Sequence, residues 1–281
     1  AFHGVPAQRI VLAGSASEFI HRITALAAQR GVRTVALPPH CYGDYAQAAL
    51  ARGLAVVRAR GTAAGLQWAC EPASPLGIED PAARAWQALA GESTDPAALR
   101  VLDCAYVPLR LDSEGAWSGA PSPRVPSACW QLWTPNKAVG LTGVRAAYAI
   151  APQGQAELVH ALVALAPSWP VGAHGVALLQ AWTQPQVQQW LVRSLATLRG
   201  WKQRQQGLCS DLGWALHEGS LANYFCARPS GVALPGALAA LRATGIKLRD
   251  ATSFGLPGTV RLGVLAPSAQ DALHAAWKAL R

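Results

Sequence analysis

The sequence predicts an α/β fold, because patterns typical of strands and of helices alternate along its first half. Short apolar runs at residues 8–13, 33–37 and 54–58 indicate buried strands. Between them, residues 18–30 and 45–52 carry apolar side chains at helical spacing. This alternation favours a mainly parallel sheet flanked by helices.

The same pattern continues to residue 170, with one gap. No helix or strand is predicted at residues 61–76. The other elements expected in this part are helices at 80–90 and 157–166 and strands at 99–102, 128–133 and 144–150.

The last third of the chain has a different organisation. Residues 175–205 carry a long helical pattern that Pro185 should interrupt or kink, with Gly200 as a second candidate break. The elements expected after residue 207 are strands at 214–217, 223–227, 247–249 and 259–264 and helices at 234–244 and 268–281. We therefore predict three parts: a large α/β domain over 1–170, a connecting long helix over 171–206 and a small α+β domain over 207–281.

The composition is that of a compact globular protein and excludes several other classes. Of 281 residues, 51% are hydrophobic and 14% charged, which does not suit a disordered chain. No apolar run reaches the length of a membrane span and no signal-peptide pattern opens the chain, so we expect a cytoplasmic protein without membrane contact. The six cysteines include no Cys-x-x-Cys pair and suit reduced core thiols, and the seven histidines lack metal-site spacing, so no metal is expected.

The formal charge of +9 raises the question of a nucleic-acid partner. The arginines are dispersed along the chain and no nucleic-acid motif is present, so no such partner is expected. The same charge would attract an anionic cofactor and substrate.

Lys137 lies between two apolar runs that are predicted to be core strands, 128–133 and 144–150. The chain has four lysines against twenty arginines, and the other three lysines stand in polar surroundings. Lys137 would be an ordinary side chain if it extends from a loop into solvent. A lysine near a core is otherwise costly unless it is used, and only lysine can form a Schiff base with an aldehyde.

The segment around Lys137 resembles the lysine motif of class I/II aminotransferases, which use pyridoxal 5'-phosphate (PLP). It reads Thr-Pro-Asn-Lys at residues 134–137 and Gly-Val-Arg-Ala-Ala-Tyr at 143–148. The family usually reads Ser-x-Ser-Lys and Gly-x-Arg-x-Gly-Tyr, and the most similar branch is histidinol-phosphate aminotransferase and threonine-phosphate decarboxylase of cobalamin biosynthesis. The resemblance implies the fold type I of PLP-dependent transferases, a Lys137 aldimine with PLP, and a homodimer with its sites near the interface.

The resemblance also implies a phosphate site in the turn between the first strand and the first helix. Ser15, Ala16 and Ser17 occupy this turn, where free backbone N–H groups and the helix dipole attract an anion. Taken alone, the pattern fits any capped helix with Ser15 or Ser17 as its N-cap. Arg145 would bind the same phosphate, although by itself it also fits a charge at a strand edge.

Two further motifs resemble the family's contacts to the pyridoxal ring. Tyr42, after a proline pair, resembles the first tyrosine of Pro-x-Tyr-x-x-Tyr, which stacks on the ring; otherwise it is a loop tyrosine packed on its neighbours. Asp-Cys-Ala-Tyr at 103–106 resembles Asp-Glu-Ala-Tyr, which implies that Asp103 pairs with the pyridine nitrogen and Tyr106 bonds the phenolic oxygen. Asp103 could instead cap a helix, but residues 107–109 do not resemble the start of one.

Three cofactor positions depart from the family's usual residues. Residues 71–77 resemble the turn Asn-Pro-x-Asn-Pro-x-Gly, with Ser74 in place of the asparagine that bonds the phenolic oxygen. Thr134 and Asn136 replace the two serines of the lysine motif. The resemblance also implies an N-terminal arm and a first helix ahead of Ala1, which we expect to precede this sequence.

Arg261 lies in an otherwise apolar strand pattern at 259–264. A buried arginine requires an anion, which Asp250 or Glu218 could supply. In the resembled family the arginine at this place binds the substrate α-carboxylate, and we assign that role to Arg261.

Taken together, these motifs predict an aminotransferase that acts on a small amino acid, phosphorylated or not, with Lys137, Asp103 and Tyr106 as catalytic residues. The alternative is an enzyme similar to threonine-phosphate decarboxylase, which would use the same residues with another bond of Cα perpendicular to the ring. A third interpretation is a non-catalytic binding or regulatory protein of the same fold. The departures from the family motif at Ser74 and Asn136 favour it.

Overall fold

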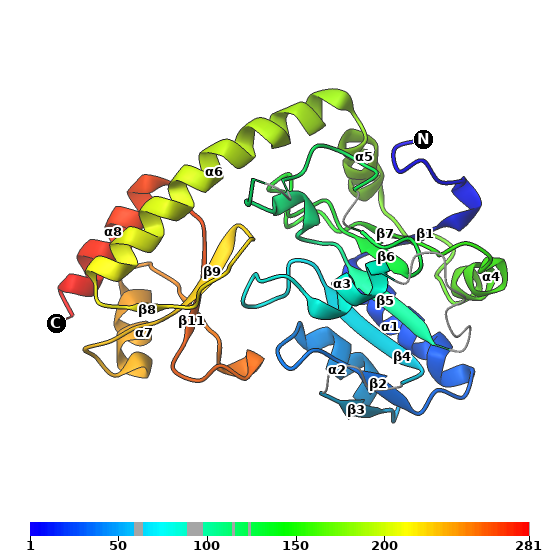
Figure 1. Ribbon diagram of the computed structural model, residues 1–281, viewed down its shortest axis with the longest axis horizontal. Coiled ribbons are helices and arrows are strands. Elements are labelled where there is room, and N and C mark those ends of the chain that lie inside the picture. The colour runs from blue at the N-terminus through cyan, green and yellow to red at the C-terminus, as the bar shows by residue number, and fades with distance from the viewer. Residues whose placement is uncertain (59–63, 89–97, 114–115, 123–124, 281) are drawn as a thin grey trace.

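Two β-sheets joined by a long helix form the protein in the computed structural model (Figure 1). The structure describes residues 1–58, 64–88, 98–113, 116–122 and 125–280.

The larger sheet has seven strands in the order β1-β7-β6-β5-β4-β2-β3. The pairs from β3 across to β6 are parallel, and β7 runs antiparallel to both of its neighbours. This arrangement confirms the predicted mainly parallel sheet. The strands are β1 (Ile10–Ala13), β2 (Thr34–Ala36), β3 (Ala55–Val57), β4 (Leu66–Cys70), β5 (Leu99–Asp103), β6 (Trp130–Trp133) and β7 (Ala147–Ile150).

Strand β4 lies in the segment where the sequence predicted no element. Four of its five residues are buried, so it lacks the alternation of apolar and polar residues that marks a strand with one solvent face. The strand predicted at 8–13 begins later, because Ala7–Arg9 form a turn of 3-10 helix.

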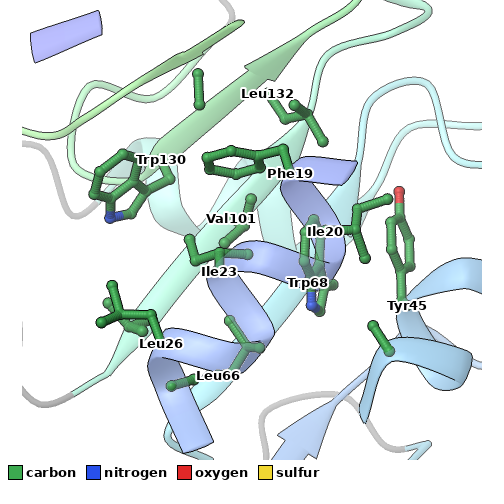
Figure 2. Close-up of a cluster of buried hydrophobic side chains, with 14 of the residues drawn as sticks. Phe19, Ile20, Ile23, Leu26, Tyr45, Leu66, Trp68, Val101, Trp130 and Leu132 are labelled. Carbon is green, nitrogen blue, oxygen red and sulfur yellow. The ribbon is translucent and has the colours of Figure 1, made fainter. Parts of the chain in front are cut away.

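Helices cover the larger sheet, and α1 (Ala16–Gln29) contributes more buried residues to the core on its side than any other described helix. Phe19, Ile20 and Ile23 of α1 are fully buried against β4, β5 and β6 (Figure 2). The other helices of this part are α2 (Gly43–Leu50), α3 (Pro81–Ala88) and α4 (Ala156–Ala164), and the predicted end of α3 at residue 90 lies outside the described residues.

The long helical pattern at 175–205 forms two helices, as the position of Pro185 predicted. Helix α5 (Ala173–Trp182) ends just before this proline, which is the first residue of α6 (Pro185–Asp211). The second break expected at Gly200 is wrong, since α6 continues through it. A glycine costs a helix only about 1 kcal/mol, and α6 is anchored by buried side chains in the apolar clusters of both sheets.

The smaller sheet has four antiparallel strands in the order β10-β11-β9-β8. Trp214 and Trp277 pack together in its core. Its elements are β8 (Ala215–Leu216), β9 (Tyr224–Arg228), α7 (Leu234–Ala243), β10 (Arg249–Asp250), β11 (Val260–Gly263) and α8 (Pro267–Lys278). The fold class is confirmed, and the domain boundaries at residues 170 and 206 remain predictions.

Several chemical features of the chain follow from this fold. All six cysteines are buried and free. None of the described helices combines the length and the apolar character that a membrane crossing requires. Within the described parts of the chain, no cluster of three His, Cys, Asp or Glu side chains suits a metal ion.

A buried ion pair fastens the turn after β4 to the segment after β5. The side chains of Glu71 and Arg110 are each 5% exposed and in direct contact. Arg110 also donates from Nε to Asp112 at 2.7 Å, and Glu71 accepts from the backbone N–H of Asp80 at 2.9 Å. Burial raises the pKa of Glu71, while the hydrogen bond from Asp80 and the charge of Arg110 oppose that rise.

We expect Arg110→Met to lower the free energy of unfolding by about 3–5 kcal/mol, because it leaves Glu71 buried without its cationic partner. Arg84→Met is the matched control, since Arg84 is 77% exposed and its contact with Glu79 is 3.9 Å long. Urea unfolding of both variants measures the difference. Equal losses in the two variants would contradict this account.

Candidate active site

Every residue to which the sequence assigned a site role lines one cavity of about 330 Å³. The cavity lies where the chain leaves β4, β5 and β6 at their C-terminal ends, which is where open parallel sheets bind ligands. Arg249, Phe254 and Arg261 close it from the smaller sheet. The predicted residues that it brings together are Ser15, Ala16, Ser17, Tyr42, Ser74, Asp103, Tyr106, Thr134, Asn136, Lys137, Arg145 and Arg261.

The turn between β1 and α1 supplies one end of the cavity. Ser15 is the N-cap of α1, and its Oγ accepts a hydrogen bond from the N–H of Glu18 at 3.1 Å. Ser17, the other candidate cap, instead shares a hydrogen bond of 3.3 Å with the hydroxyl of Tyr42. The first-turn N–H groups of a helix lack partners within the helix, so this end of the cavity is suited to an anion.

The loop that carries Lys137 is shaped by the two residues that depart from the family motif. Thr134 donates from Oγ1 to Asn136 Oδ1 at 2.9 Å. Asn136 donates to the carbonyl oxygens of Thr142 and Val144 at 3.4 and 3.2 Å. These hydrogen bonds close the loop between Lys137 and Arg145, so that both cations reach the same cavity.

Lys137 is half-buried, and its Nζ lies 5.2 Å from the centre of the Tyr106 ring. The ammonium group therefore faces an aromatic wall of the cavity instead of extending into bulk solvent.

Asp103, at the end of β5, is 6% exposed and accepts one hydrogen bond on each oxygen. Oδ1 accepts from the N–H of Ala105 at 2.9 Å, and Oδ2 accepts from the hydroxyl of Tyr45 at 2.6 Å. Residues Val107–Leu109 do form a turn of 3-10 helix, contrary to the expectation, but its N-cap is Tyr106 and Asp103 does not cap it. Tyr45 was not predicted as a site residue, although it stands three residues after Tyr42, as the second tyrosine of the proline–tyrosine motif does.

Arg261 contacts two tyrosines, through a hydrogen bond and a cation–π interaction. The alternative of a salt bridge to Asp250 or Glu218 is not found among the described residues. Arg261 donates to the Tyr106 hydroxyl at 3.0 Å, and its guanidinium lies 3.7 Å from the centre of the Tyr224 ring. The Asp250 carboxylate instead accepts hydrogen bonds from the N–H and the hydroxyl of Thr252. Arg261 therefore retains the capacity to bind an anion in the cavity.

Arg249 is a third arginine of the cavity and the second from the smaller sheet, and no role was predicted for it from the sequence. It lies directly opposite Arg261 in the register of β10 and β11. Its guanidinium is 5.1 Å from the centre of the Phe254 ring and donates to Ser253 Oγ at 2.9 Å. Among the described residues, the cavity lining carries four cationic side chains, those of Lys137, Arg145, Arg249 and Arg261, and one carboxylate, that of Asp103. The charge of the cavity therefore favours anions.

The turn that carries Ser74 is held against the smaller sheet. The hydroxyl of Tyr224 donates to the carbonyl oxygen of Ala73 at 3.3 Å, and the thiol of Cys226 lies 3.3 Å from the carbonyl oxygen of Pro75. Gly77 has φ +76°, and a Cβ there would lie 2.5 Å from Ser220 Oγ, so only glycine fits this close approach.

The protein has a mainly parallel sheet of seven strands and a smaller antiparallel sheet, and residues from both parts line a cavity that holds Lys137. This arrangement is that of fold type I of the PLP-dependent enzymes. Residues 1–280 match the family model described as aminotransferase class I and II, and the chain belongs to this family.

Solved structures with the same fold share little sequence with this chain. The histidinol-phosphate aminotransferase from Clostridium acetobutylicum is 17% identical with a TM-score of 0.76, over 97% of this chain and 83% of that one. The L-threonine-O-3-phosphate decarboxylase from Porphyromonas gingivalis is 18% identical with a TM-score of 0.72, over 99% and 85%. The histidinol-phosphate aminotransferase from Sinorhizobium meliloti, in complex with pyridoxal-5'-phosphate, is 19% identical with a TM-score of 0.78, over 99% and 79%. No curated protein sequence matches this chain.

Proposed function

We propose that the protein is a PLP-dependent aminotransferase that acts on a small amino acid bearing a second anionic group, such as a phosphate. The observation that carries this proposal is the presence of Lys137, Asp103, Tyr106 and Arg261 in one cavity of a chain that belongs to this family.

The residues present fit PLP, which has a phosphate, an aldehyde, a phenolic oxygen and a ring nitrogen. Asp103 is the one carboxylate of the cavity lining and has only neutral hydrogen-bond donors among the described residues, so it can pair with a ring N–H. The phosphate would be held by Arg145 and the turn at residues 15–17, the phenolic oxygen by Ser74 and Tyr106, the ring face by Tyr42 and the aldehyde carbon by Lys137. When bound, PLP supplies an electron sink for the charge that develops on the substrate Cα.

The protein's own groups then bind the substrate and move its proton. Arg261 binds the substrate carboxylate, which orients the bonds of Cα. Lys137 Nζ takes the Cα proton and returns it to a neighbouring atom, as a general base and acid. Tyr106 contacts both groups, since its hydroxyl lies 3.0 Å from Arg261 and its ring centre 5.2 Å from Lys137 Nζ.

The paired arginines support a substrate with two anionic groups. Residues opposite each other on antiparallel strands project from the same face, so Arg249 and Arg261 approach the cavity together. No carboxylate among the described residues forms an ion pair with either arginine. A threonine-phosphate decarboxylase would use the same pair, and it remains the alternative reaction of this site.

Adding PLP to the purified protein tests the proposal directly. We expect a visible absorbance band that shifts when the amino-acid substrate is added, and we expect Lys137→Ala to lose both the band and turnover. Lys247→Ala, which removes an exposed lysine, is the control and should keep both. Turnover by Lys137→Ala would exclude this lysine, and a protein that never takes up PLP would support the non-catalytic alternative.

The substrate class is tested by comparing threonine phosphate with threonine. We expect Arg249→Met to raise KM for threonine phosphate about tenfold to 150-fold, the range of one hydrogen bond to a charged group, with little change for threonine. Arg242→Met, on the exposed end of α7, is the matched control. CO2 release and keto-acid-dependent transfer, measured in parallel, separate the two reactions, and an unchanged KM in Arg249→Met would reject the second anion site.

A homodimer is also part of the proposal, on the family resemblance. We expect Trp169 at the interface, because this side chain is 91% exposed and the next residue, Pro170, approaches Gly14 beside the phosphate turn. Sedimentation velocity should give twice the 29.4 kDa mass of the chain, and Trp169→Ser should weaken the association. A monomer at micromolar concentration would contradict this part of the proposal.

A further inference from the structure

The carboxylate of Asp103 is bound on the protein side by neutral donors alone. The N–H of Ala105 holds Oδ1, and the hydroxyl of Tyr45 holds Oδ2 at 2.6 Å, the shorter of the two hydrogen bonds. No arginine, lysine or histidine among the described residues forms an ion pair with Asp103. The orientation of this charge toward the cavity therefore depends on Tyr45 and on one backbone group.

Tyr45 is placed rigidly enough to impose that orientation. It is fully buried, and its ring stacks on Trp68 with centroids 4.5 Å apart and planes 11° apart (Figure 2). The ring of Tyr42 meets it edge-on at 5.8 Å. Burial, and after it the charge of Asp103, hold the pKa of Tyr45 well above its ordinary value, so the hydroxyl keeps its proton and remains a donor.

We propose that Tyr45 is a positioning residue: its hydroxyl aims the Asp103 carboxylate at a ring N–H of the bound cofactor and so contributes to the affinity for aromatic nitrogen cations. This inference rests on the proposed function. Tyr45 is not part of the cavity lining, so its hydroxyl reaches the cofactor site only through Asp103.

Tyr45→Phe tests the proposal, because it removes one hydroxyl and keeps the ring that stacks on Trp68. Equilibrium binding is measured for PLP and for its 1-deaza analogue, in which a carbon replaces the ring nitrogen. We expect Tyr45→Phe to weaken PLP binding about tenfold to 150-fold, the range of a hydrogen bond to a charged group, and to leave binding of the analogue within about twofold. A purely structural role would weaken both ligands equally.

Two variants complete the test. The double variant Tyr45→Phe/Asp103→Asn should bind PLP as Asp103→Asn does, because the hydroxyl has then lost the charge on which it acts. Trp68→Phe, which keeps the hydroxyl, should retain the preference for PLP over the analogue.

Four results would overturn the inference. Equal losses for both ligands, or a further loss in the double variant, would reject Tyr45 as a positioning residue while leaving the proposed function intact. If the Tyr45→Phe variant does not fold, the hydroxyl is needed for folding, and this result would also reject Tyr45 as a positioning residue. A wild-type protein that binds neither ligand would refute the proposed function, and this inference with it.

Discussion

The cavity depends on a set of hydrogen bonds that fastens the turn after β4 to the smaller sheet. The N–H of Leu221 donates to the carbonyl oxygen of Gly77 at 2.7 Å. The N–H of Leu111 donates to the carbonyl oxygen of Leu221 at 2.6 Å. Lys202, buried in α6, donates to the carbonyl oxygens of Ser220 and Ala222 at 2.5 and 2.8 Å. These contacts join the two sheets and so help to fix Arg261, on β11, relative to Lys137, in the loop after β6.

Burial of Lys202 in this junction has an electrostatic cost. Desolvation lowers its pKa to about 8, with the charge of Asp112 acting in the opposite direction. The three hydrogen bonds that its amine makes offset part of that cost. The buried ammonium group of Lys202 has a structural use here. The segment around Ser220 is irregular backbone, and its buried carbonyl oxygens require hydrogen-bond donors.

Local sequence patterns predicted much of the fold, and their failures have identifiable causes. Strand β4 escaped detection because it is buried on both faces, and its apolar run is then not distinguishable from other buried segments. The break expected at Gly200 depends on how α6 is packed at its two ends, which no local pattern shows. Pro185 was predictable because its effect is purely local.

The site could be predicted only where a motif carries its chemistry. Resemblance supplied the predicted lining residues, and the structure brings them to one cavity. Arg249 and Tyr224 were not predicted because only the folded smaller sheet brings each of them beside Arg261. Tyr45 matches the second tyrosine of the proline–tyrosine motif, but its partner Asp103 lies 58 positions further along the chain. Contacts of this kind are created by the fold, and neither spacing nor composition records them.

The small number of lysines acquires a meaning once the site is known. Aldehydes react with amines, and the guanidinium group of arginine stays protonated and does not compete. With twenty arginines and only four lysines, the chain presents few rival ε-amines, and one of these, that of Lys202, is buried in the sheet junction. Chemical selectivity for Lys137 is thus supported by the composition of the whole surface as well as by the shape of one cavity.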